Sequence, residues 1–111
     1  MKKIMLVAAH PDDELLGSAG TLLFYKKKGY NIKIIFLSDG ESSRNISENK
    51  KKFLIKKRKS QAKKISKLCK FTEPAFAEFP DNRLDTIPML TIVKFVENEI
   101  KKFKPTIIIT H

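Results

Sequence analysis

A short apolar run that turns directly into a cluster of charged residues constrains the fold of this chain most. Residues 4–9, Ile-Met-Leu-Val-Ala-Ala, have the pattern of a strand buried on both faces. His10, Pro11 and the acidic residues 12–14 follow without a spacer. Apolar residues then recur at helical spacing: Leu15, Leu16, Ala19, Leu22 and Leu23. We therefore expect a strand-to-helix turn whose polar cluster lies at the carboxyl end of a buried strand, where open α/β sheets bind ligands.

Strand and helix patterns alternate along the rest of the chain. Gly29 is expected to end the first helix. Further strands are expected over residues 31–38, 74–79 and 106–110, and further helices over about 47–70 and between Thr86 and Pro105, with Pro88 in the first turn. This βαβαβαβ order predicts an α/β fold, a Rossmann-like three-layer αβα arrangement with a parallel sheet. The less hydrophobic third strand should be an edge strand, and the fourth should lie beside the first.

The length and the single cysteine favour one intracellular domain. A chain of 111 residues is close to the modal domain size. Cys69 cannot form an internal disulfide, which favours a reducing compartment. The apolar run that follows Lys3 is too short for a signal peptide or a membrane span. We therefore expect a soluble, cytoplasmic protein with no membrane span, whose oligomeric state follows from none of these patterns.

A net charge of +11 raises the question of nucleic-acid binding. Most of the excess lies in residues 50–70, where Lys dominates and Arg58 is the one arginine. Aromatic residues are not interleaved with these charges, and no nucleic-acid recognition motif is present. We therefore expect a solvated helix face and no nucleic-acid partner.

The polar turn itself has two interpretations. Carboxylates in a first helical turn complement the helix dipole, and Pro is common there, so the turn can simply cap a helix. Alternatively, His10 and Asp13 can bind one metal ion, which leaves Asp12 to take a proton from a metal-bound water. The ends of the four predicted strands meet at one edge of the sheet and carry His10, Asp39, Asp81 and His111. That coincidence favours a site over a helix cap.

Two further features of the sequence indicate which ligands such a site could bind. A dinucleotide-binding turn needs glycines for backbone approach to a pyrophosphate, whereas Asp12 and Asp13 would repel one. Arg58 lies in the middle of an apolar stripe of the second helix, between Leu54 and Ala62. Such an arginine can extend to solvent past its apolar neighbours, or it can anchor an anionic or hydroxyl-rich substrate.

Several segments resemble one enzyme family. Ala9-His10-Pro11-Asp12-Asp13-Glu14 is similar to the signature of the LmbE-like/PIG-L deacetylases, which are zinc enzymes that remove N-acetyl groups from glucosamine-containing substrates. The resemblance continues over residues 38–41, at Arg58, over residues 79–84 and over residues 104–111, so it covers essentially the whole chain.

The resemblance implies a Rossmann-like fold and a role for each matching residue. His10 and Asp13 would be Zn²⁺ ligands, and Asp12 would be the general base. Arg58, Asp81 and His111 are candidates for contacting the substrate, a small-molecule N-acetylglucosamine-type amino-sugar conjugate. The alternative function is a non-catalytic Rossmann-like binding domain whose acidic turn only caps a helix.

The sequence departs from the family in two places. Lys59, Ser60 and Gln61 stand where the family usually has an acidic residue shortly after the helix arginine. The third zinc ligand of the family is a histidine in an Asp-His pair beyond the position of His111, and this sequence ends before that pair. We therefore expect residues 1–111 to be the amino-terminal part of a single deacetylase domain, incomplete at the carboxyl end and inactive alone.

Overall fold

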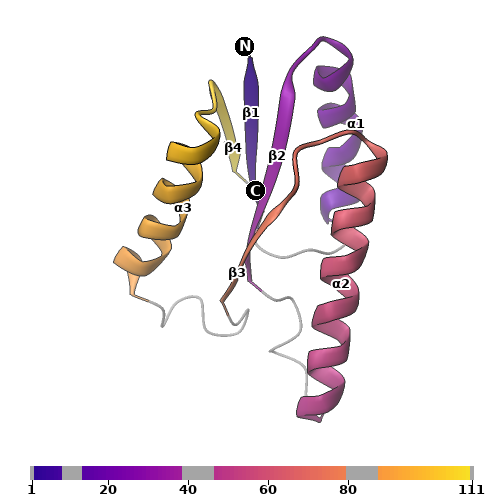
Figure 1. The fold of residues 1–111 in the computed structure, drawn as a ribbon, viewed down its shortest axis with the longest axis vertical. Helices are drawn as coiled ribbons and strands as arrows, with labels where there is room; N and C mark the ends of the chain where they lie inside the picture. The colour runs from indigo at the N-terminus through magenta and orange to yellow at the C-terminus, as the bar shows by residue number, and fades with distance from the viewer. Residues whose placement is uncertain (1, 9–13, 39–46, 80–87, 111) are drawn as a thin grey trace.

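The computed structural model describes residues 2–8, 14–38, 47–79 and 88–110, with the backbone alone for residues 14–19 and Glu78. Strands and helices alternate along the chain in the predicted order (Figure 1). The strands are β1 (Lys3–Ala8), β2 (Asn31–Ser38), β3 (Ala75–Phe79) and β4 (Ile107–Thr110). The helices are α1 (Glu14–Lys27), α2 (Glu48–Leu68) and α3 (Met89–Phe103).

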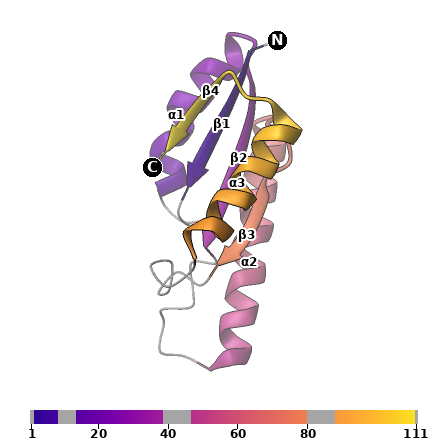
Figure 2. The same ribbon diagram turned by 90° about the vertical axis from the view of Figure 1, so that its left-hand side faces the viewer.

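The four strands form one parallel sheet in the order β3-β2-β1-β4. Helices α1 and α2 cover one face of the sheet and α3 covers the other (Figures 1 and 2). The predicted α/β class, with three layers and a parallel sheet, is therefore confirmed. The predicted places of two strands are also confirmed, because β3 is an edge strand and β4 pairs with β1.

Alternating side chains of the central strands form two cores, one on each face of the sheet. Ile4, Leu6 and Ala8 of β1 pack with Leu22 of α1 and Ala62 of α2. On the other face, buried Met5 of β1 and Ile35 of β2 pack with Phe103 of α3. Because both faces of β1 and β2 are covered, these strands are apolar almost throughout, as the sequence indicated.

Strand β4 is much less covered than its apolar sequence predicts. Ile107 is 40% exposed and Ile108 is 46% exposed. Their β1 partners, Ile4 and Met5, are completely buried. The exposed isoleucines lie on opposite faces of an edge strand, because successive side chains of a strand alternate. Both faces of the sheet are therefore thinly covered at β4.

The helix ends combine confirmed and unexpected features. Gly29 ends α1 with a φ of 91°, as predicted, and the amide of Tyr30 donates to the carbonyl of Tyr25 over 3.1 Å. Helix α2 ends in the same way, but its left-handed residue is Lys70, with a φ of 60°. The amide of Phe71 donates to the carbonyl of Ser66 over 2.8 Å and closes that turn. A glycine is therefore not required for this kind of helix end.

The predicted start of α2 agrees with the structure, whereas the predicted start of α3 does not. Ser47 caps α2, because its Oγ accepts a 3.2 Å hydrogen bond from the amide of Lys50. Pro88 is the N-cap of α3 and so lies outside its first turn, which corrects the expected start at Thr86. Thr86 itself lies outside the described residues.

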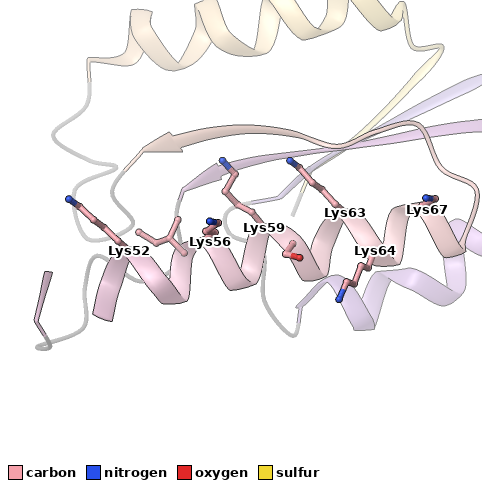
Figure 3. A pocket seen from close by; sticks show the side chains of 8 residues that line it. Lys52, Lys56, Lys59, Lys63, Lys64 and Lys67 are labelled. Carbon is pink, nitrogen blue, oxygen red and sulfur yellow. The ribbon is translucent and has the colours of Figure 1, made fainter. Parts of the chain in front are cut away.

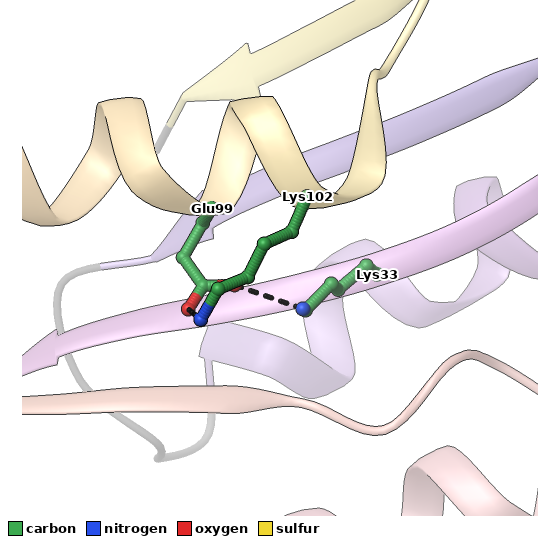
Figure 4. Close-up of polar contacts among 3 residues, drawn as sticks. All are labelled: Lys33, Glu99 and Lys102. Atoms are coloured by element: carbon green, nitrogen blue, oxygen red, sulfur yellow. Dashed lines mark hydrogen bonds and ion pairs between the residues drawn. The ribbon is translucent and has the colours of Figure 1, made fainter.

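An ion pair attaches α3 to the sheet. Lys33 Nζ of β2 lies 2.8 Å from Glu99 Oε2 of α3, and the two side chains are 14% and 10% exposed (Figure 4). Lys102 lies 4.0 Å from the other carboxylate oxygen, but its side chain is 72% exposed. Removal of one member of a buried ion pair leaves the other charge unpaired, so loss of either residue should weaken the contact of α3 with the sheet.

Glu99→Gln should therefore lower the free energy of unfolding by about 2–4 kcal/mol, because it leaves the Lys33 ammonium buried without a counter-charge. The double variant Lys33→Met/Glu99→Leu should be less destabilised than the sum of the losses in its two single variants, Lys33→Met and Glu99→Leu. Urea unfolding measures both, and Glu97→Gln, on the exposed side of the same helix, is the control. Additive effects of the two single changes would show that the pair contributes nothing.

Candidate functional site

The carboxyl ends of the four strands lie at one edge of the sheet. The register pairs Ala8 with Phe36, Ser38 with Phe79, and Val7 with Thr110, so neighbouring strands end at nearly the same level. The strand arrows in Figures 1 and 2 point toward this edge. All the predicted site residues except Arg58 belong to segments that follow these ends directly in the sequence.

Five of the six predicted site residues lie outside the described part of the chain: His10, Asp12, Asp13, Asp81 and His111. Their roles remain predictions. Arg58 is described and lies on α2, where it is half-buried. This burial agrees with its place in the predicted apolar stripe, of which Ala62 is 3% exposed. Whether Arg58 contacts a substrate also stays a prediction.

Ser38 is a polar residue at this edge that the sequence analysis did not single out. It is the last residue of β2 and is 2% exposed, and its Oγ has no hydrogen-bond partner among the described residues. A buried hydroxyl without a partner costs about 1–3 kcal/mol, and few buried polar atoms in native proteins lack one. The signal in the sequence was a lone serine that closes an apolar run and directly precedes Asp39.

The chemistry of the predicted residues is suited to a zinc ion. Imidazole and carboxylate, the side chains of His10 and Asp13, are common zinc ligands. The Ser38 hydroxyl, which lacks a partner in the described part of the chain, fits such a site as well, since carboxylates that bind metals usually accept hydrogen bonds from neighbouring groups. Within residues 2–8, 14–38, 47–79 and 88–110, no three His, Cys, Asp or Glu side chains form a cluster that could hold a metal ion.

The sequence model of the PIG-L family, described as GlcNAc-PI de-N-acetylase, matches residues 5–111. The chain therefore belongs to the PIG-L family, as the motif had indicated. No curated protein sequence matches it significantly.

Several solved structures share the fold. N,N'-diacetylchitobiose deacetylase from Pyrococcus horikoshii aligns with a TM-score of 0.82 at 19% identity, over 96% of this chain and 39% of its own. GalB, the 4-carboxy-2-hydroxymuconate hydratase from Pseudomonas putida, aligns with a TM-score of 0.79 at 18% identity, over 100% and 47%. The conserved protein TT1542 from Thermus thermophilus aligns with a TM-score of 0.71 at 25% identity, over 97% and 45%.

Two facts follow from these alignments. The chain spans less than half the length of each of these structures. The fold also serves a deacetylase in one protein and a hydratase in another, so the fold alone does not specify the reaction.

If the Ser38 hydroxyl donates a hydrogen bond to a group bound at the strand ends, Ser38→Ala in the complete enzyme should lower Zn²⁺ affinity by about 10-fold or more, the effect typical of a lost neighbour to a metal ligand. Ser66→Ala is a matched control, since Ser66 is also 2% exposed and its Oγ has no partner among the described residues, but it lies on α2. Calorimetric titration with zinc measures the affinity, and thermal melting should show both variants to be at least as stable as the parent, because each removes a buried hydroxyl that lacks a described partner. Equal zinc affinity in the two variants would exclude this role for Ser38.

Proposed function

We propose that this protein is a zinc-dependent deacetylase that removes the N-acetyl group from an N-acetylglucosamine-type amino-sugar conjugate. The observation that carries this proposal is the PIG-L match over residues 5–111. The parallel sheet supports it, because the motif with His10, Asp12 and Asp13 follows the carboxyl end of the buried central strand β1. Open α/β sheets bind their ligands at that edge.

The residues of the motif divide the chemistry of amide hydrolysis between them. His10 and Asp13 would hold zinc, which when bound makes a water acidic enough to ionise near neutral pH and polarises the acetamide carbonyl. Asp12 would accept the proton of the attacking water as the carbon–oxygen bond forms. The same carboxyl group would return that proton to the nitrogen as the carbon–nitrogen bond breaks. The products are acetate and the free amino sugar.

We further propose that residues 1–111 form the amino-terminal part of one deacetylase domain. Two protein ligands are fewer than the three that catalytic zinc sites usually have. The solved structures extend well beyond the aligned region, which makes up 39–47% of their own length. The exposure of Ile107 and Ile108 on β4 also favours further protein beside this strand. These residues alone should therefore bind zinc weakly and have no deacetylase activity.

Asp12→Asn in the complete enzyme should lower kcat by about two orders of magnitude or more, because the amide cannot take the proton of the water. The zinc content should stay unchanged, since Asp12 is not a predicted ligand. Release of acetate from N-acetylglucosamine conjugates measures the rate, and elemental analysis measures the metal.

His10→Ala is the companion variant, because it should remove the metal as well as the activity. Deacetylation within a few-fold of the parent rate in Asp12→Asn would exclude Asp12 as the base. A parent protein without stoichiometric zinc would favour the alternative, a binding domain whose acidic turn only caps a helix.

Arg58 can be tested by the same assay. Arg58→Ala should lower kcat/KM by about 10-fold or more if the guanidinium holds the substrate, since hydrogen bonds to charged groups contribute about 1.5–3 kcal/mol. The melting temperature should change little. Lys57→Ala, an exposed neighbour on the same helix, is the control for loss of charge. Normal kinetics combined with a lower melting temperature would assign Arg58 to packing.

A further inference from the structure

The outer side of α2 carries a row of lysines that lines a shallow groove of about 630 Å³ (Figure 3). The lining side chains all belong to this helix: Lys52, Ile55, Lys56, Lys59, Ser60, Lys63, Lys64 and Lys67. None of the described residues that line the groove is acidic or an arginine. The one acidic residue of α2, Glu48, lies in its first turn.

The spacing of these lysines concentrates positive charge on one strip of the helix. Lys52, Lys56, Lys59, Lys63 and Lys67 follow one another at intervals of three or four residues, so they lie on one face. At a rise of 1.5 Å per residue, the strip is roughly 22 Å long. Like charges at this spacing repel one another and weaken the helix. An anionic surface laid against the strip would remove that repulsion.

Part of this strip is fixed in position by the sheet. Figure 3 shows Lys59 and Lys63 extending from the side of α2 that faces β3. Their ammonium groups lie over the ring of Phe76 on β3, at 5.2 and 6.0 Å from its centre. That ring in turn stacks on the buried ring of Phe36 at 5.3 Å. Lys59 and Lys63, which line the groove on the side nearer the sheet, are therefore held in position by their contact with Phe76.

Large apolar side chains lie beside the lysines at both ends of the helix. Phe53 is 65% exposed and Leu68 is 82% exposed. Ser60 and Lys64 connect them at spacings of seven, four and four residues, so the two apolar side chains share one flank of the groove. Leu68 also lines a second hollow, of about 490 Å³, together with Lys64 and Lys67. Basic residues flanked by exposed apolar ones are typical of helices that lie on a membrane surface.

We propose that this face of α2 is a docking surface for anionic phospholipid bilayers. The lysines would lie among the lipid headgroups, and Phe53 and Leu68 would enter the boundary with the acyl chains. The protein would bind without crossing the bilayer, and no described helix is both long and apolar enough to span one. The proposal concerns the outer face of one helix and does not depend on the proposed deacetylase function.

The details of the surface favour a bilayer over a nucleic acid. Lysine is a point charge that suits a fluid array of headgroups, whereas arginine, which grips phosphates in a fixed geometry, is absent from the described lining of the groove. No described lining residue is aromatic, and the exposed ring of Phe53 on the flank could stack on one base, whereas proteins that bind single strands stack successive bases on several rings. A phosphate backbone would also offer no apolar partner for Phe53 and Leu68.

Co-sedimentation with vesicles tests the proposal. The protein should bind vesicles of phosphatidylcholine mixed with phosphatidylserine, should not bind pure phosphatidylcholine, and should bind less tightly as salt increases. Lys52→Gln/Lys56→Gln/Lys67→Gln spares the lysines over Phe76 and should weaken binding by about 100-fold, at roughly fivefold for each lysine near the surface. The matched control Lys94→Gln/Lys101→Gln/Lys104→Gln removes the same charge from exposed positions elsewhere and should change binding only slightly.

Phe53→Ser/Leu68→Ser should also weaken binding to the mixed vesicles without lowering the melting temperature, because both side chains are already exposed. Equal losses in the α2 variant and the control would overturn the proposal, since net charge would then explain the binding. Failure to bind the mixed vesicles at low salt would overturn it too. So would binding of duplex DNA or single-stranded RNA that depends on the same α2 lysines while vesicles are not bound.

Discussion

Burial of β1 and β2 on both faces is the constraint on which the rest of the structure depends. Ile4, Met5, Ile34 and Ile35 are completely buried, which leaves these strands no solvated face for polar side chains. Polar residues of the central strands are therefore confined to their ends or, like Lys33, need a charged partner from a covering helix. The same constraint favours the carboxyl edge of the sheet, where Ser38 ends β2, as the place of the candidate site.

Much of this fold could be predicted from the sequence because its strongest signals are local. Apolar runs, helical periodicity and Gly29 were sufficient to predict the order of the elements, and the connections between parallel strands then left few possible topologies. The left-handed Lys70 and Lys104 were not predicted, since such positions usually contain glycine. Nor was the burial of Glu99, 7% exposed, because its partner Lys33 lies 66 residues away in the sequence.

The candidate site was predictable to a different extent. The structure confirms the topology, from which the predicted place of the site at the strand ends follows. The roles of His10, Asp12 and Asp13 stay predictions, supported by the resemblance to a family to which the chain does belong. Ser38 lies in the matching residues 38–41 but was given no role of its own, because a serine at a strand end is ordinary in a sequence. It becomes informative only when the structure shows that its hydroxyl is buried and has no partner among the described residues.

The distribution of charge shows why a global property of a sequence can mislead about function. The chain carries a net charge of +11, yet three consecutive acidic residues, 12–14, follow β1 closely in the sequence. A metal ion tolerates such an acidic segment, and the phosphates of a nucleic acid do not. The basic excess is concentrated on α2, a helix whose buried side packs on the sheet through Ala62 and whose outer side carries the lysines. Net charge therefore reports on the outer surface of this helix, and the chemistry at the strand ends has to be inferred from the residues that follow each strand.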